Sequence, residues 1–237
     1  MTSRPSAVPR LDVRTGEGVA QVRPHVPDPA VRPVGTLLLG HGAGGQQDAA
    51  DVLALTALTD RGWTVVLVDQ PWRVAGRRVA TRPESLDRAW TDVLTTLREQ
   101  RWQDAHGIPL PGPWVLGGRS AGARVACRTS VVDAHPRLGP GGVVCLAFPL
   151  HPPGRPERSR AHELAVPVSA GLPTLVVQGT NDPFGSPAEI SAAVSGDPLT
   201  LREVPGTHSP SRDLAALRDH VAAFLSHLVP AVQEDHP

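Results

Sequence analysis

The chain has 237 residues, of which 40% are hydrophobic and 19% are charged, and its 23 basic residues balance its 23 acidic residues. A chain of this length buries roughly 70–75% of the surface that it exposes when unfolded, which is ample for a hydrophobic core. The balanced charge argues against nucleic-acid binding, the lack of a long apolar run argues against a membrane span, and the polar N-terminus is not that of a signal peptide.

The pattern of apolar residues predicts strands that alternate with helices along most of the chain. Two short alternating segments on either side of Gly16-Glu17-Gly18 predict an edge hairpin, and the later apolar runs predict strands that are buried on both faces. In chain order, the predicted strands cover residues 11–14, 19–22, 36–39, 63–68, 114–116, 143–147, 174–177 and 199–204. Runs with helical periodicity predict helices over residues 51–61, 84–101, 121–132, 187–194 and 214–228.

This alternation is typical of an α/β fold, in which a mostly parallel sheet is covered by helices on both faces. No shift in composition indicates a second domain. We therefore expect a loose N-terminal segment at residues 1–9, one domain over residues 10–230 and a C-terminal tail at residues 231–237.

A G-x-S-x-G pentapeptide with Ser120 at its centre links the strand predicted at 114–116 to the helix predicted at 121–132. Its two glycines remove the side chains that would clash in a tight strand-to-helix turn. The hydroxyl of Ser120 would then lie at the start of a helix, where unpaired backbone N–H groups favour negative charge. On its own, the pentapeptide is equally compatible with a glycine-rich connection in which the serine has no role.

Two further residues with catalytic chemistry follow predicted strands. Asp182 comes after strand 174–177 and His208 after strand 199–204, and the carboxyl ends of parallel strands meet at one edge of a sheet. Because a serine hydroxyl needs a base, and the base needs an orienting acid, this order of serine, aspartate and histidine favours a connected catalytic set. Taken singly, Asp182 is interpreted as a turn former and His208 as a surface or capping residue.

The glycine-rich loop at residues 40–45 follows the strand predicted at 36–39. It is flexible enough to turn its backbone N–H groups toward Ser120, and with the N–H of Ala121 it would form an oxyanion hole. The alternative is a phosphate-binding turn, but the loop lacks both the Gly-Lys-Ser/Thr of a P-loop and the G-x-G-x-x-G spacing.

Short motifs spread along the chain carry a resemblance to a known family, and they lie at residues 41–44, 76–78, 117–124, 148–154, 179–185 and 208–209. Over about residues 10–230 the chain resembles the α/β-hydrolase superfamily. It is most similar to a small compact branch that is related to dienelactone hydrolases and includes subunits of chromatin-regulatory complexes. Many relatives carry a sizeable lid, whereas this chain has only the proline-rich stretch 148–172, so we expect a minimal lid or none.

The resemblance implies a role for each of five residues. Ser120 would be the nucleophile, His208 the general base and Asp182 the acid that orients it. The backbone N–H groups of Ala43 and Ala121 would be the oxyanion donors.

Four further residues are candidates for substrate binding, namely His41, Trp72, Arg119 and His151. Trp72 would line the cleft or pack on its rim. Arg119 would attract a substrate carboxylate or pair with an acidic neighbour, and we favour the pairing. His151 would bind substrate or supply a proton, or it would be solvated in a rigid proline turn, and we favour the solvated turn.

Together these features predict a serine hydrolase that cleaves a small ester, thioester or related acyl substrate. A non-catalytic binding or scaffold module with the same fold is the alternative from another class, and an acyltransferase with the same three residues is a third. Cys127 and Cys145 lie in apolar segments, so they are interpreted as buried thiols of a cytoplasmic protein. No metal-binding spacing occurs, so no metal or other cofactor is expected. The expected partner is a small-molecule acyl substrate, and not a nucleic acid or a membrane.

Overall fold

The computed structural model describes residues 8–44, 48–131 and 140–229. Its centre is an eight-stranded sheet with the strand order β1-β2-β4-β3-β5-β6-β7-β8. Strand β2 pairs antiparallel with β1 on one side and with β4 on the other, and all the other pairs are parallel. The strands are β1 Leu11–Thr15, β2 Gly18–His25, β3 Gly35–Gly40, β4 Trp63–Asp69, β5 Trp114–Arg119, β6 Gly142–Leu146, β7 Thr174–Gly179 and β8 Leu199–Val204.

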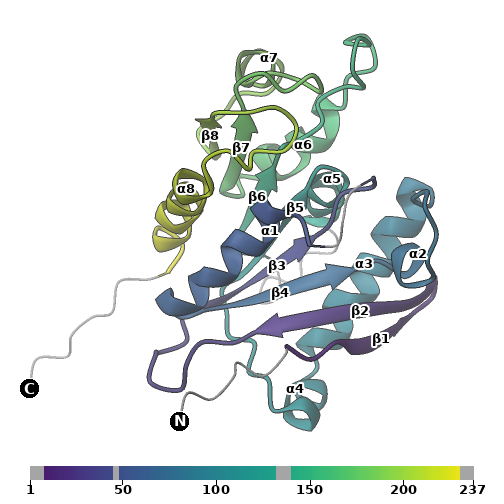
Figure 1. Ribbon diagram of the computed structural model, residues 1–237, viewed down its shortest axis with the longest axis vertical. Coiled ribbons are helices and arrows are strands. Elements are labelled where there is room, and N and C mark those ends of the chain that lie inside the picture. Colours follow the sequence, from purple (N-terminus) through teal and green to yellow (C-terminus); the bar gives the residue numbers. More distant parts are fainter. Residues whose placement is uncertain (1–7, 45–47, 132–139, 230–237) are drawn as a thin grey trace, which may run out of the picture.

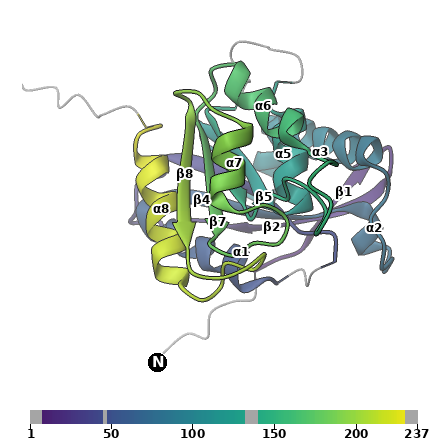
Figure 2. The same cartoon turned by 90° about the horizontal axis from the view of Figure 1, so that it is seen from above.

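Helices follow most of the parallel strands, and they are α1 Ala50–Ala54, the 3₁₀ helix η1 Leu55–Arg61, α2 Pro71–Val74, α3 Pro83–Arg98, α4 Gln100–His106, α5 Ala121–Thr129, α6 Ala161–Ser169, α7 Pro187–Ala193 and α8 Leu214–Ser226. Helices α1 and α8 lie on one side of the sheet, while α3, α5 and α6 lie on the other (Figures 1 and 2). The prediction of a mostly parallel sheet with helices on both faces is confirmed. Within the described ranges, none of these helices combines the length and the apolar character needed to cross a membrane.

The alternation of side chains along the buried strands produces two cores, one on each face of the sheet. In β3, Leu38 belongs to the core under α3 and α5, whereas Leu37 and Leu39 belong to the core under α1 and α8. All three leucines are at most 1% exposed. Because the strand is covered on both faces, its sequence is continuously apolar instead of alternating.

Several predicted helices differ from the observed ones. The predicted helix 84–101 is two helices, because Glu99 adopts an extended conformation with φ −68° and ψ 120°, and the turn buries Trp102 of α4 in the core. The predicted helix 51–61 is α1 followed by η1, and α2 and α6 were not predicted at all. The predicted helix 121–132 is too long, because α5 ends at Thr129 and a turn follows it. Residue 132, most of segment 1–9 and the whole tail 231–237 lie outside the described residues.

A partly buried ion-pair network joins the three helices on one face of the sheet, with Glu163 as its most buried member. Glu163 of α6 accepts two hydrogen bonds from Arg124 of α5, at 2.6 and 2.7 Å, and one from Arg128 at 3.1 Å. Arg128 also donates two hydrogen bonds to Asp87 of α3, at 2.6 and 2.8 Å. Bidentate pairs of this kind fix orientation as well as distance, so α6 and the chain that leads into it are tied to the helix that begins beside Ser120.

Candidate active site

Ser120 occupies a sharp turn between β5 and α5, where it has φ 52° and ψ −108°. A non-glycine residue in this region of backbone conformation costs about 1–3 kcal/mol, and such strain is concentrated at functional sites. The turn is held by a hydrogen bond of 2.9 Å from the N–H of Ser120 to the carbonyl of Leu146, at the end of the neighbouring strand β6. Ser120 therefore lies just beyond the end of β5 and just before the start of α5.

The two glycines of the pentapeptide are required by close backbone contacts. A Cβ atom on Gly118 would lie 2.5 Å from the carbonyl oxygen of Gly40 in the adjacent strand β3. A Cβ atom on Gly122 would collide with the same carbonyl group. The pattern therefore allows α5 to begin directly against the end of β3, and this brings the loop that follows β3 beside Ser120.

The structure brings Ser120, His208 and Asp182 into contact in series. His208 Nε2 lies 2.8 Å from the Oγ atom of Ser120, and His208 Nδ1 lies 2.9 and 3.1 Å from the two carboxylate oxygens of Asp182. These distances fit a tautomer in which Nδ1–H donates to the carboxylate and Nε2 accepts the serine proton. The Asp182 side chain is fully buried and the His208 side chain is 18% exposed, so the chain of contacts runs from the interior to the surface.

Two residues that the sequence reasoning missed hold Asp182 and His208 in place. Gln178, in β7, donates hydrogen bonds of 2.8 Å to Asp182 and to the carbonyl of Gly185, and the N–H of Phe184 donates to the other carboxylate oxygen at 2.8 Å. The ring of Phe184 also stacks on the His208 imidazole, with centroids 4.0 Å apart and an interplanar angle of 28°. In the sequence, the only indication of this role was a glutamine near the end of an otherwise apolar strand.

Arg119 fastens the loop that carries His208 to the rest of the site. Its Nε donates to buried Asp51 of α1 at 2.9 Å, and its Nη2 donates to the carbonyl of His208 at 2.9 Å and to the hydroxyl of Ser209 at 2.6 Å. The pairing with an acidic neighbour that we favoured is thus present. The guanidinium group is committed to protein atoms, which leaves it poorly placed to bind a substrate carboxylate.

The loop after β3 lies against Ser120, as an oxyanion hole requires. A Cβ atom on Gly42 would be 3.6 Å from the Cβ of Ser120, and the next residue is Ala43, which is half-buried. On the other side, Ala121 is the first residue of α5, and the first N–H groups of a helix have no partner within it. The loop that carries Ala43 thus packs against Ser120, and Ala121 directly follows the serine; their assignment as oxyanion donors stays a prediction.

His41 and Trp72 line a small cavity beside Ala121, with a volume of about 10 Å³. The ring of His41 accepts a hydrogen bond from the N–H of Gln70 through Nε2 at 3.1 Å, and its Nδ1 donates to the carbonyl of Gly42 at 2.9 Å. Burial lowers the pKa of His41, which keeps the ring neutral. Both ring nitrogens bind backbone atoms, so His41 shapes the oxyanion loop and presents only its ring to the cavity.

His151 differs from the solvated residue that we favoured. It is 7% exposed, and its two ring nitrogens lie 3.0 Å from the carbonyl of Pro152 and 3.3 Å from the carboxylate of Glu189. The preference for a solvated turn is therefore wrong, because the backbone N–H of His151 also donates to the carbonyl of Phe184 at 3.0 Å and draws the loop inward.

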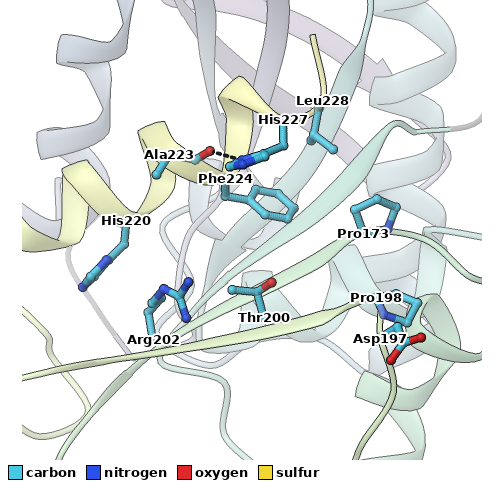
Figure 3. Close-up of a pocket in the computed structure, with 10 residues that line it drawn as sticks. All are labelled: Pro173, Asp197, Pro198, Thr200, Arg202, His220, Ala223, Phe224, His227 and Leu228. Carbon is cyan, nitrogen blue, oxygen red and sulfur yellow. Dashed lines mark hydrogen bonds between the residues drawn. The ribbon is translucent and has the colours of Figure 1, made fainter. Parts of the chain in front are cut away.

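A separate hollow of about 410 Å³ lies at the outer edge of the sheet, between β8 and α8. Figure 3 shows the Phe224 ring at its centre, with Arg202 and His220 at one end and Pro173 and Pro198 at the other. It contains none of the residues that gather around Ser120. Within the described ranges, no three histidine, cysteine, aspartate or glutamate side chains are placed to hold a metal ion.

The sheet has eight strands in this order, and its serine lies at a strained strand-to-helix turn. The histidine and the aspartate lie on loops that follow later strands. These features define the class of α/β-hydrolase folds. A family profile described as an alpha/beta hydrolase domain matches residues 33–218. The chain belongs to this family. Among curated protein sequences, none matches the chain.

Solved structures share the fold over nearly the whole chain. A serine hydrolase without a lid from Xanthomonas campestris is 22% identical, with a TM-score of 0.66 and coverage of 98% of this chain and 99% of that chain. A serine hydrolase homologue from Coxiella burnetii is 18% identical, with a TM-score of 0.68 and coverage of 97% and 99%. A dienelactone hydrolase from Anabaena variabilis is 16% identical, with a TM-score of 0.68 and coverage of 94% and 98%. These likenesses agree with the fold that the sequence predicted.

Proposed function

We propose that the protein is a serine hydrolase that cleaves a small ester, thioester or related acyl compound through a covalent acyl-enzyme. The observation that carries the proposal is the unbroken series of hydrogen bonds from Ser120 through His208 to Asp182, at 2.8 and 2.9 Å. A serine hydroxyl becomes an effective nucleophile when a neighbouring imidazole can take its proton. A binding module without catalysis has no need of this geometry.

In the first half of the reaction, the Ser120 oxygen attacks the substrate carbonyl while its proton moves to Nε2 of His208. Asp182 stabilises the resulting imidazolium and keeps the ring in the tautomer whose Nε2 accepts. The negative charge that develops on the carbonyl oxygen is stabilised by the backbone N–H groups of Ala43 and Ala121. His208 then gives its proton to the departing alcohol or thiol, and the acyl group remains on Ser120.

In the second half, water takes the place of the alcohol. It loses a proton to His208 as it attacks the acyl-enzyme, and the proton returns to Ser120 as the acid is released. The stacking of Phe184 on His208 supports this cycle, because it limits the rotation of the imidazole while leaving Nε2 directed at the serine.

The test is hydrolysis of a para-nitrophenyl ester by Ser120→Ala. We expect kcat to fall by about 10⁴–10⁶ with the circular dichroism spectrum unchanged. Ser211→Ala is the matched control, since Ser211 is exposed and lies in the same loop as His208, and it should retain activity. Full activity in Ser120→Ala would refute the proposal.

We also propose that the protein works in a reducing compartment such as the cytoplasm. Cys127 and Cys145 are fully buried free thiols, with their Sγ atoms 3.4 Å apart and no disulfide between them. Burial raises the pKa of Cys127, and the hydrogen bond with Cys145 raises it further. Cys127 is therefore an unreactive thiol. Localisation of a tagged chain by fractionation tests this expectation.

A further inference from the structure

Two surface segments next to the candidate site are rich in arginine. The first rim segment, residues 70–82, contains four arginines and no acidic residue, and the second rim segment, residues 148–160, contains three arginines and one glutamate. In a chain whose formal net charge is zero, these two segments therefore have a combined net charge of +6, and the remainder has a net charge of −6. Basic charge is thus concentrated in two short parts of the chain.

Both rim segments border the reacting serine. In the first, Trp72 and Ala80 line the small cavity that Ala121 also lines. In the second, the N–H of His151 donates to the carbonyl of Phe184, and Phe184 stacks on His208. Figure 1 shows α2 and the loop that leads into α6 on the same side of the molecule, flanking α5. Each rim segment therefore contains a residue that lies one contact away from Ala121 or His208.

Most of the arginines in the rim segments have no side-chain partner among the described residues. Five of them are exposed and form neither an ion pair nor a side-chain hydrogen bond within the part of the chain that the structure describes, and these are Arg77, Arg78, Arg82, Arg155 and Arg158. By contrast, Arg119, Arg124 and Arg128 of β5 and α5 all pair with carboxylates. Guanidinium groups that face solvent without a counter-charge are available to an incoming anion.

We propose that the substrate of this enzyme is anionic, with a carboxylate or phosphate on the portion that extends from the reacting carbonyl toward the rim segments. The inference deepens the proposed hydrolase function and rests on it. Guanidinium groups bind such oxyanions through paired hydrogen bonds, and a concentration of one charge at the mouth of a site raises the rate of encounter with the opposite charge by about 10–10³-fold. The net charge of the whole chain, which is zero, gives no indication of this local excess of positive charge.

The experiment compares a neutral ester, para-nitrophenyl butyrate, with an anionic one of similar length, mono-para-nitrophenyl glutarate. At low ionic strength, kcat/KM for the anionic ester should exceed that for the neutral ester by about tenfold or more. The ratio of the two should fall toward one as sodium chloride is added, because salt screens exposed charges. Glutarate or phenyl phosphate should compete with the anionic ester, and the stronger competitor distinguishes a carboxylate substrate from a phosphate.

Arg77→Gln/Arg78→Gln should lower the anionic-to-neutral ratio about tenfold. The matched control is Arg32→Gln/Arg202→Gln, which removes two exposed arginines that form no ion pair within the described residues and lie outside both rim segments, and it should leave the ratio unchanged. Hydrolysis of both esters with no charge preference, competition by neither anion, or an equal effect in the control pair would overturn the anionic substrate alone. Hydrolysis of neither ester would overturn the hydrolase function as well.

Discussion

Arg119→Ala should affect both stability and activity, because this guanidinium binds a buried carboxylate and the histidine loop together. Asp51 is 2% exposed, and the Arg119 side chain is 11% exposed. Removing one partner of a buried pair leaves an uncompensated charge and costs about 3–5 kcal/mol. Arg119→Ala should therefore lower the free energy of unfolding by this amount, as measured by urea titration with tryptophan fluorescence.

The control for this prediction is Arg88→Ala, which breaks a pair with Glu17 at 2.7 Å where the Arg88 side chain is 62% exposed. An exposed pair contributes about 0–1 kcal/mol. The double variant Arg119→Met/Asp51→Asn should recover much of the lost stability, because no buried charge then lacks a partner. A loss in Arg119→Ala no greater than that in Arg88→Ala would refute the reasoning.

Arg119 also holds the carbonyl of His208, so its loss should change catalysis beyond any loss of folded protein. A displacement of a catalytic group by about 1 Å can reduce turnover about 10²-fold. Under conditions where the variant remains folded, kcat should fall with little change in KM, the pH profile of kcat should shift, and Arg119→Lys should restore part of the rate. A rate proportional to the folded fraction alone would limit Arg119 to a structural role.

Three further predictions concern the turn, the acid and the helix network. Asp182→Asn should lower kcat by about 10⁴ while the protein stays folded, since the imidazole loses its orienting acid; a kcat within about tenfold of the parent would contradict this. Gly122→Ala should destabilise the fold by about 1–3 kcal/mol in urea titration, because its methyl group meets the carbonyl of Gly40; an unchanged midpoint would count against the close backbone contact. Burial raises the pKa of Glu163, but hydrogen bonds from Arg124 outweigh it and hold that pKa below its usual value. Its stabilising contribution is therefore present above about pH 4.5 and is lost as the pH falls through the lowered pKa. In Glu163→Gln, the free energy of unfolding should therefore fall less steeply as the pH is lowered below this value. A fall as steep as in the parent protein would show that other groups cause the acid destabilisation.

The strands could be predicted because a strand that is buried on both faces has a recognisable run of apolar residues. Strands that are covered on both faces need continuous apolar runs, and Leu37-Leu38-Leu39 and Val143-Val144 provide them. The helix breaks were not predictable in the same way. The periodicity of residues 84–101 continues past Glu99, whereas in the structure Glu99 is extended and Trp102 packs in the core, a long-range contact that the local pattern does not contain.

Some residues of the candidate site could also be predicted from the sequence, and others could not. The series of Ser120, His208 and Asp182 could be predicted because each residue follows a strand, and parallel strands bring their carboxyl ends together. The partner of Arg119 could not, because Asp51 is 68 residues away in the sequence and belongs to a helix on one face of the sheet. The burial of His151 was missed because it depends on a contact with Phe184, which a proline-rich sequence does not indicate.

The most direct test of the central claim is to find which atom becomes acylated. The folded protein is treated with a fluorophosphonate, its intact mass is measured, and the modified peptide is sequenced by mass spectrometry. One adduct is expected, on the hydroxyl of Ser120, formed rapidly in the parent protein and very slowly in His208→Ala. An adduct on another residue, or a folded protein that stays unmodified across a range of pH, would contradict it.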